Sequence, residues 1–379
     1  MPPVNTSALI PDAIVREHQV RAAELMRARR IDALVVFRGT NILGFAGVPL
    51  EPSDRLVCAV LTADAEVELV CPAFESSIAD PTPCRGRVRT WREHDDPHAT
   101  LAEVLGQAGL DRAAIALDGY TWIAAAARIR AALPRAHVVD DPGVLESVRL
   151  IKSDAELDVM REAARATGRI YGIVKPILAP GISEVEAARR ADAGFAALGY
   201  TPGHSLLQGG PNAAVPHQPS NARPIAEGDL VIVDYVAAQH SYLGDMTRTF
   251  AVGRPGEKAR RAYRVVREAQ RAAIAACRPG ATCESVDAAA RRVVEEAGLG
   301  EFFIHRTGHG IGLDVHEPPY LVAGNRQPLA AGMVVTVEPG VYVPGEFGVR
   351  IEDVVAVTPD GPRVLSDGVA TDVSEELRD

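Results

Sequence analysis

The chain has 379 residues, of which 47% are hydrophobic and 24% are charged, and its formal net charge is −10. This length allows two domains with large cores, and the composition is typical of a globular protein. The negative charge argues against a nucleic-acid-binding surface, and no apolar run approaches the ~18 residues that a membrane helix needs.

The first part of the chain mixes helix and strand patterns. Its start, MPPVNTSALIPDA, lacks the basic residues and apolar run of a signal peptide. Residues 14–30 predict an amphipathic helix, and Leu34–Phe37 predicts a short buried strand. RLVCAVL and VELVCP predict two further strands around a turn at TADAE, while TLAEVLGQAGL and TWIAAAARIRAAL predict helices. No glycine-rich phosphate loop is present, so residues 1–145 are expected to form an α/β domain.

A second domain is predicted for residues 146–379, which gives the whole chain an α+β architecture. Ser153 is expected to cap its first helix, and Glu156 to complete a capping box. Strand pairs are predicted between four helices, which we expect near residues 154–174, 183–198, 257–276 and 284–297.

The second domain contains a weak internal repeat. EGDLVIVDY and AGMVVTVEP each combine a turn glycine, an apolar strand and a carboxylate, which is Asp234 in the first copy and Glu338 in the second. Each copy is followed by a strand with another carboxylate, Asp245 in YLGDMTRTF and Glu352 in VRIEDVVAV. The repeat predicts two β-hairpins with an acid on both strands, where cross-strand neighbours lie close enough to share a ligand.

A stretch rich in histidine and glycine, HRTGHGIGLDVHEPP, occupies residues 305–319. It is not the His-Glu-x-x-His helix of zinc proteases, because Pro318 would break that helix and position 320 is tyrosine. His305 and His309 can instead point to one side from a strand. The glycines between them allow other groups to approach the backbone closely, which predicts the wall of a site.

Four carboxylates among apolar strand residues repel one another unless cations lie between them. Together with one imidazole they suit two divalent ions about 3.5–4 Å apart. Oxygen-rich ligation favours Mn²⁺, with Fe²⁺, Co²⁺ and Zn²⁺ as alternatives.

Five positions combine into one pattern of motifs and spacings: Asp234 in LVIVDY, Asp245 in GDMTRTF, His309 in HRTGHGIG, Glu338 in TVEPGVY and Glu352 in GVRIED. The pattern resembles the five metal ligands of the pita-bread metallopeptidases, which include methionine aminopeptidase, aminopeptidase P and prolidase. The resemblance spans about residues 150–375. The HEPP motif, and an N-terminal domain similar to that of prolidase, aminopeptidase P and creatinase, indicate the proline-directed branch.

The resemblance also implies roles for residues outside the ligand set. His217, in VPHQPSN, is similar to the histidine beside the substrate and the second metal. His305 and His316 resemble two histidines that line the substrate site, with His316 near the developing oxyanion. Arg350 resembles the arginine that holds a ligand carboxylate, and Tyr342 a tyrosine that supports it.

The implied protein is a cytoplasmic, homodimeric metallo-exopeptidase that hydrolyses Xaa-Pro bonds in dipeptides or at peptide N-termini. Glu338 is its expected general base, and His316 its oxyanion donor. Dipeptidase and aminopeptidase both stay open. The simpler interpretation of Arg326 is a solvated loop residue, and its alternative role, a guanidinium that clamps a C-terminal carboxylate, together with the compact N-terminal domain, slightly favours the dipeptidase. Val236 departs from the glycine that relatives usually have, which should narrow the pocket or shift the strand.

Other functions remain as alternatives on the same fold. Ectoine hydrolase and a sulfoniopropionate lyase resemble this pattern and retain metals, whereas creatinase lacks the ligands and is disfavoured. A non-catalytic binding module is the alternative from another class, and the intact ligand set and net acidity argue against it.

The five cysteines are odd in number and form no Cys-x-x-Cys pair, which predicts reduced thiols in a cytoplasmic protein. Cys283, in PGATCES, falls at a predicted helix start, where a thiolate would be favoured. Since the sequence offers it no His or Asp partner, we interpret it as structural.

Overall fold

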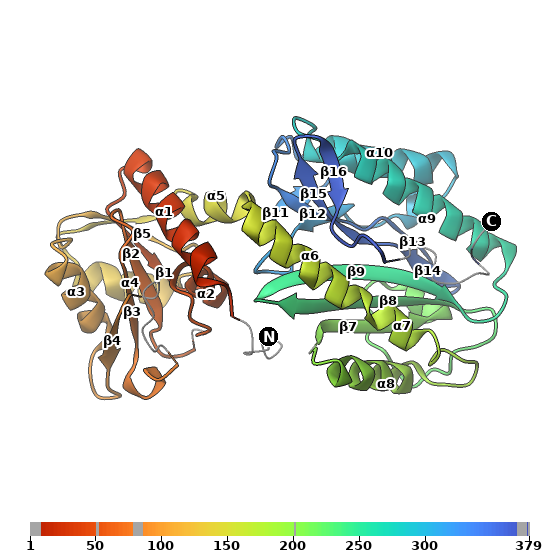
Figure 1. Cartoon of the computed structure of the whole chain (residues 1–379), viewed down its shortest axis with the longest axis horizontal. Helices are drawn as coiled ribbons and strands as arrows, with labels where there is room; N and C mark the ends of the chain where they lie inside the picture. The colour runs from red at the N-terminus through yellow and green to blue at the C-terminus, as the bar shows by residue number, and fades with distance from the viewer. Residues whose placement is uncertain (1–8, 51–52, 79–85, 201, 370–376, 378–379) are drawn as a thin grey trace. The chain divides into compact units, whose positions relative to one another are not determined.

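The structure of this protein is a computed structural model, and it describes these residues (Figure 1): 9–50, 53–78, 86–200, 202–369 and 377. The chain divides into two compact units between Arg149 and Leu150. Among the described helices, none combines the length and the hydropathy that crossing a membrane requires.

The N-terminal unit is built on a six-stranded mixed sheet in the order β4-β3-β2-β1-β5-β6. The strands are β1 (Ala33–Val36), β2 (Cys58–Thr62), β3 (Val67–Pro72), β4 (Arg87–Trp91), β5 (Ala114–Leu117) and β6 (His137–Asp140). The helices are α1 (Asp12–Arg29), α2 (Gly39–Ala46), α3 (Pro97–Gln107), α4 (Ile123–Ala132) and α5 (Val144–Leu150).

The central strand β1 is apolar along its whole length because both faces of the sheet are covered. Leu34 and Val36 pack into one hydrophobic core, and Ala33 and Val35 into the other. This alternation is the two-residue period of a strand. The predicted helices and strands of this part of the chain, and its α/β character, are confirmed.

Within its described residues, the second unit contains three sheets. The first has the order β7-β8-β9 and the second the order β11-β10-β12-β15-β16, while β13 and β14 form a separate pair. The strands are β7 (Pro202–Gly209), β8 (Leu230–Gln239), β9 (Tyr242–Ala251), β10 (Gly308–Gly310), β11 (Glu317–Leu321), β12 (Val334–Val337), β13 (Gly340–Val343), β14 (Phe347–Arg350), β15 (Asp353–Thr358) and β16 (Gly361–Val364).

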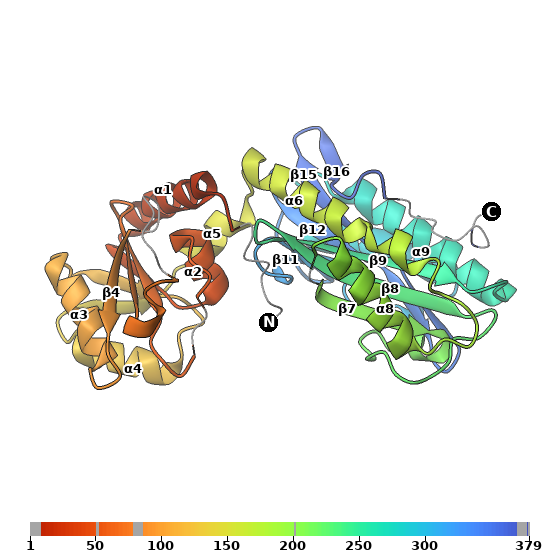
Figure 2. The same ribbon diagram turned by 60° about the horizontal axis from the view of Figure 1, so that its bottom comes forward.

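Helices cover the two larger sheets of this unit. They are α6 (Asp154–Gly168), α7 (Ile170–Val174), α8 (Glu184–Ala197), α9 (Glu257–Ala276) and α10 (Cys283–Glu296). In Figures 1 and 2, α6 and α8 accompany the β7–β9 sheet, and α9 and α10 accompany the sheet of β12 and β15. The cores agree: Phe195 of α8 packs with Val233, and Val266 of α9 packs with Val355. The predicted α+β class is therefore confirmed.

The helix predictions of this unit hold with small changes. Ser153 and Glu156 form the expected capping box, in which the Ser153 backbone N–H donates to Glu156 Oε2 at 2.8 Å. The helix expected over 154–174 is interrupted at Arg169 and continues as α7.

The repeat prediction is right for its first copy and partly wrong for its second. Asp234 lies on β8 and Asp245 on β9, which form one continuous hairpin. In the second copy β12 does pair with β15, but Glu338 and Glu352 lie just outside both strands. Pro339 has no N–H for the ladder, and the chain between the two acids forms the separate β13–β14 hairpin.

Candidate metal centre and its cavity

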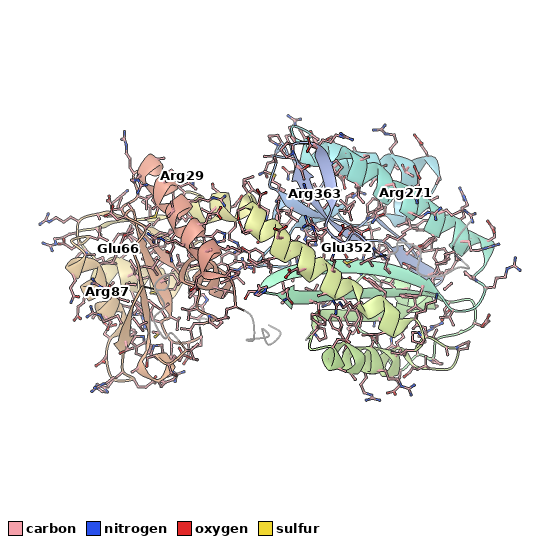
Figure 3. The ribbon with its side chains drawn as sticks, in the orientation of Figure 1. Arg29, Glu66, Arg87, Arg271, Glu352 and Arg363 are labelled. Atoms are coloured by element: carbon pink, nitrogen blue, oxygen red, sulfur yellow. The ribbon has the colours of Figure 1, made fainter. Side chains whose placement is uncertain are left out.

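A cavity of about 690 Å³ in the second unit brings the predicted site residues together. It is lined by all nine of them: Asp234, Asp245, His309, Glu338, Glu352, His217, His305, His316 and Arg350. Glu352 is buried inside the unit, whereas Arg271 and Arg363 on the same unit are exposed (Figure 3). The nine residues predicted from the sequence therefore surround one cavity.

Strand alternation directs the first two acids into this cavity. On β8, Val233 and Tyr235 face the hydrophobic core beneath α8, so Asp234 between them faces the opposite side. On β9, Met246 faces that same core and its neighbour Asp245 faces the cavity. The acids thus stand on the face of the hairpin that looks toward the second half of the unit.

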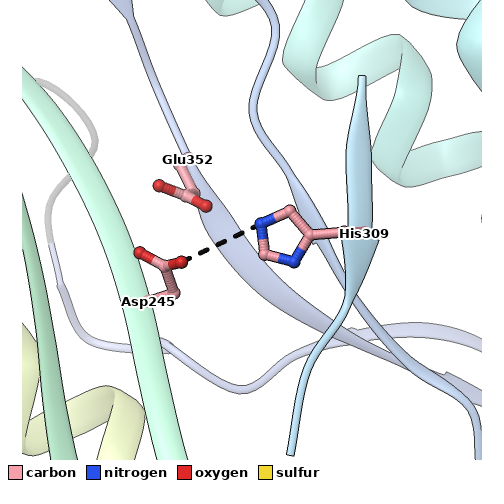
Figure 4. A group of neighbouring side chains, drawn as sticks. All are labelled: Asp245, His309 and Glu352. Atoms are coloured by element: carbon pink, nitrogen blue, oxygen red, sulfur yellow. Dashed lines mark ion pairs between the residues drawn. The ribbon is translucent and has the colours of Figure 1, made fainter. Parts of the chain in front are cut away.

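Three buried residues offer ligand atoms that lie within 4.8 Å of one another: Asp245, His309 and Glu352 (Figure 4). His309 Nε2 is 3.9 Å from Asp245 Oδ2 and 3.3 Å from Glu338 Oε1. Burial lowers the pKa of His309 to about 3, so its imidazole is neutral. Its Nδ1 lies 3.0 Å from the carbonyl oxygen of Gly310. With Nδ1–H donating there, the Nε2 lone pair points at the carboxylates, the arrangement of a metal-binding histidine.

The glycines beside His309 are required by close backbone packing. A Cβ on Gly308 would lie 1.9 Å from Thr336 O, and one on Gly310 would lie 2.1 Å from Pro318 O. Any other residue would push β10 away from its neighbours. The two glycines therefore keep β10 close to its neighbouring strands, so that the His309 imidazole lies next to the carboxylates.

The carboxylates of the cavity are crowded in a dry environment. Burial, reinforced by neighbouring carboxylates, raises the pKa of Asp245 and Glu352 well above the ordinary range. Burial likewise raises the pKa of Glu338 to about 7. Asp234 Oδ1 is buried without a hydrogen-bond partner among the described residues. Acids that repel one another, an orphaned oxygen and a neutral imidazole form a donor set that fits divalent cations.

Arg350 is the buried cation beside these acids, and each of its three guanidinium nitrogens makes a hydrogen bond. Its Nη2 lies 2.5 Å from Asp234 Oδ2, its Nη1 2.9 Å from the Tyr342 hydroxyl, and its Nε 3.2 Å from Thr247 Oγ1. The Tyr342 hydroxyl in turn lies 2.8 Å from His305 Nε2. Burial lowers the pKa of His305 to about 4, so this imidazole is neutral and can accept from Tyr342.

Three of the histidines that line the cavity are exposed: His204, His217 and His316. His316 is exposed to it, and its ring stands edge-on to that of His309 with centroids 4.3 Å apart. Burial and the charge of Arg306 lower the pKa of His316, so it presents a neutral N–H. His217 lines the cavity from the loop that follows Ala214.

Several residues that the sequence analysis passed over position the ligands. Thr247 Oγ1 donates to Glu352 Oε2 at 2.7 Å. Arg248, fully buried, lies 2.7 Å from Asp353 Oδ1 through Nη2 and donates to Glu352 O at 2.6 Å through Nη1. Thr247 and Arg248 belong to the GDMTRTF motif, but nothing local in that motif indicates partners more than a hundred positions away.

Val236 lies between the pocket and an irregularity in the sheet. It is buried, lines the cavity and pairs with Asp245, and the β8–β9 register runs through it without a break. On the other side of β8, the pairing with β7 shifts between Pro202 and His204, opposite Ala237 and Val236. Both expectations for Val236, a narrower pocket and a shifted strand, are therefore consistent with its position, and the shift falls on the β7 side.

Arg326 is the solvated loop residue that the simpler interpretation of the sequence predicts, and the alternative of a carboxylate-binding residue is wrong in its geometry. Its side chain is 88% exposed, lies 3.8 Å from Glu284 Oε1 and is not among the residues that line the cavity. Loop residues near a site in sequence need not face it, because the loop's backbone direction decides where they point.

The thiols play no evident part in this site. Cys283 is buried in a hydrophobic core, and burial raises its pKa to about 11, which excludes a stable thiolate near neutral pH. The four cysteines within the described part of the chain are unpaired, and Cys84 lies outside the described residues.

Comparisons with known proteins agree with this geometry. The sequence profile of metallopeptidase family M24 matches residues 158–359, and that of the creatinase/prolidase N-terminal domain matches residues 20–151. The chain is 38% identical over 357 residues to the probable dipeptidase PepE of Mycobacterium tuberculosis, covering 91% of this chain and 93% of that protein.

Two further relatives extend the similarity. An Xaa-Pro dipeptidase of Lactobacillus delbrueckii subsp. lactis is 34% identical over 357 residues, covering 92% of this chain and 95% of that protein. The crystal structure of dipeptidase PepE from Mycobacterium ulcerans superposes with a TM-score of 0.86 at 35% identity, covering 94% of this chain and 96% of that one.

Proposed function

The chain belongs to metallopeptidase family M24, and on that premise we propose that it is a dinuclear metal-dependent exopeptidase that hydrolyses Xaa-Pro bonds. The family and its dipeptidase relatives make the chain a metallo-exopeptidase. The observation that supports dinuclear metal binding and Xaa-Pro cleavage is the cavity. Four carboxylates and the neutral imidazole of His309 line it together with accessible histidines.

Five side chains would hold the cations: Asp234, Asp245, His309, Glu338 and Glu352. The donors are mostly carboxylate oxygens, so Mn²⁺ is the expected ion, with Co²⁺, Zn²⁺ and Fe²⁺ as alternatives. When bound, such cations supply positive charge that makes a water molecule acidic and polarises a carbonyl group.

Glu338 is the residue that would move the proton in this reaction. Its carboxylate lines the cavity among the proposed ligands, and it would take a proton from the attacking water and later release it. The nitrogen of proline in a peptide bond carries no hydrogen, so it must receive a proton before it can leave. Glu338 would return the proton there.

His316 and Arg350 would assist in different ways. His316 faces the cavity with a neutral ring, from which an N–H can donate to the oxyanion that forms on the scissile carbonyl. Arg350 holds Asp234 in place through its 2.5 Å contact and is too deeply buried to meet the substrate.

The proposal is tested with a metal-supplemented assay on Xaa-Pro dipeptides, Xaa-Pro-Yaa tripeptides and ectoine-like amides. We expect cleavage before proline, loss of activity with a chelator and recovery with Mn²⁺. Absence of bound metal after loading would favour the non-catalytic binding module, and cleavage of the amides alone would favour the other hydrolases of this fold.

Two histidine variants separate metal binding from oxyanion stabilisation. His309→Ala should lose metal, whereas His316→Ala should retain it and lose about 10²–10³ in kcat, the usual cost of one oxyanion donor. Elemental analysis beside steady-state kinetics measures both. Equal metal loss in the two variants would contradict this division of roles.

A further inference from the structure

We propose that the buried ion pair of Lys152 and Glu317 positions His316 for catalysis from behind the wall of the cavity. The inference rests on the proposed function and deepens it, because it names what holds the oxyanion donor in place. Lys152 and Glu317 are positioning residues: neither lines the cavity, whereas His316 does.

His316 has little support of its own. The ladder between β10 and β11 pairs Glu317 with Gly310, and its register shifts between Gly310 and His309. His316 precedes Glu317 and so lies just outside β11. Among the described residues its ring makes no hydrogen bond, and it packs edge-on against the ring of His309. The position of the ring therefore depends on what fixes the neighbouring residue.

Strand alternation makes Glu317 the residue through which His316 can be held. Neighbouring residues of an extended chain point to opposite sides, so a Glu317 side chain that points away from the cavity turns His316 toward it. Behind the wall, Glu317 Oε1 accepts from Lys152 Nζ at 2.6 Å. The two side chains are only 2% and 7% exposed, so water and salt screen their attraction little.

Lys152 is itself fixed to two other elements of the unit. Its backbone N–H donates to the carbonyl oxygen of Gly332 at 2.8 Å, in the turn before β12. The next residue, Ser153, is the N-cap of α6 and belongs to its capping box. A Cβ on Gly332 would lie 2.7 Å from Ile151 Cγ2, so this turn comes close to Lys152 only because the residue is glycine. Glu317 is thus drawn to an ammonium group in a defined place.

Gly312, the last glycine of the GHGIG stretch, makes room for the ion pair. A Cβ there would lie 2.8 Å from Glu317 Oε1 and 3.2 Å from Lys152 Cε. The carbonyl oxygen of Gly312 accepts from the backbone N–H of Leu243 on β9 at 2.9 Å. The loop that leads to His316 is therefore tied to β9 at its start and to Lys152 at its end.

A buried ion pair suits positioning better than it suits stability. Replacing such a pair by uncharged residues of similar size often leaves stability unchanged, because taking two charges out of water offsets their attraction. The short contact nevertheless selects one arrangement of the chain. An oxyanion donor needs that precision, since a displacement of about 1 Å can lower a rate by about 10²-fold.

The test removes the pair in the presence and in the absence of His316. Lys152→Met/Glu317→Gln leaves no unpaired buried charge, so it should fold and bind metal as the wild type does. Its kcat on Ala-Pro should fall by about 10–100-fold with little change in KM, because the donor is displaced rather than the substrate. In a His316→Ala background the same double substitution should change kcat little, because the group through which it acts is missing. Steady-state kinetics, elemental analysis and melting temperature measure these effects.

Two further variants separate positioning from general damage. Gly312→Ala keeps both charges but places a methyl group against them, so it should also lower kcat, and this effect too should vanish in the His316→Ala background. Lys258→Met is the matched control: it removes a lysine from an exposed ion pair of the same unit and should leave kcat and KM unchanged.

The outcomes separate this inference from the proposed function. A wild-type kcat in Lys152→Met/Glu317→Gln, or an undiminished further loss in the His316→Ala background, overturns the positioning role and leaves the proposed function standing. If the double variant does not fold, the same comparison with Gly312→Ala decides the question. A wild-type enzyme that cleaves no Xaa-Pro substrate when loaded with metal overturns the proposed function and this inference with it.

Discussion

The two halves that supply the acids of the cavity are built differently. In the first half, Asp234 and Asp245 lie inside an uninterrupted hairpin, where backbone pairing on both strands holds them. In the second half, Glu338 and Glu352 lie at the junctions between the five-stranded sheet and the β13–β14 hairpin. A residue at such a junction has fewer ladder bonds of its own to fix it.

The first half compensates by holding the second. Three consecutive side chains of β9 reach across: Thr247 to Glu352, Arg248 to Asp353 and Thr249 to the backbone of Arg350. In the other direction, the guanidinium of Arg350 contacts Asp234. Strand β9 therefore supports both halves, and substitutions on β9 should disturb the second pair of acids, Glu338 and Glu352.

The largest expected effect is that of Arg248→Met. It would leave the buried carboxylate of Asp353 without its cation, and breaking one partner of a buried ion pair costs about 3–5 kcal/mol. Denaturant unfolding of the metal-free protein measures this loss directly. A change below about 1 kcal/mol would mean that β9 does not hold the second half through this pair.

The acids at the junctions should also make the metal-free protein sensitive to pH. The pKa of Glu338 is raised to about 7, so the folded state binds a proton that the unfolded chain releases near pH 4.5. That stability is complete below about pH 4.5 and is lost as the pH rises through about 7, an effect of about 3 kcal/mol.

Unfolding of the chelated protein at pH 5, 6, 7 and 8 tests this slope, with Glu338→Gln as the control that cannot ionise. The variant should lose less stability than the wild type across this interval. Parallel curves for the two proteins would show that Glu338 is ionised throughout.

A smaller effect is expected for Thr247→Val, which removes the hydroxyl that donates to Glu352 and accepts from Arg350 Nε. Removing such a partner of a metal ligand typically costs 10–100-fold in metal affinity, which calorimetric titration with Mn²⁺ measures. Thr249→Val is the matched control on the same face of β9, because its hydroxyl contacts only the backbone of Arg350. Equal losses of metal affinity would refute a specific role for Thr247.

The smallest effect should come from Lys258→Met. Lys258 Nζ lies 2.6 Å from Glu346 Oε1 in the turn of the β13–β14 hairpin, but the two side chains are 57% and 49% exposed. An exposed ion pair contributes less than about 1 kcal/mol. Lys258→Met should therefore lower the free energy of unfolding much less than Arg248→Met does. Similar losses of stability in the two variants would contradict the difference between the exposed ion pair and the buried one.

Local patterns in the sequence were sufficient to predict many of the helices and strands. The helix expected over 257–276 is α9 with the same bounds, and the capping box at Ser153 and Glu156 forms as expected. Helical periodicity and capping depend on neighbours within a few residues, so they can be read from a short window. The motifs, together with the family resemblance that they carry, likewise selected nine residues, and all of them line one cavity.

Those local patterns could not predict contacts between segments that are distant in the sequence. The sequence could not show that Arg248 is paired with Asp353, nor that a separate hairpin lies between Glu338 and Glu352. It also suggested Arg326, which faces solvent, and passed over Arg306, which faces the cavity.

The sequence by itself therefore determined which side chains are candidates for the site, because residue type and spacing are properties of the chain. Only the tertiary structure decided which arginine lines the cavity and which strand holds the acids. Those outcomes depend on long-range strand pairing and on burial, which appear only when segments such as β9 and β15 lie side by side.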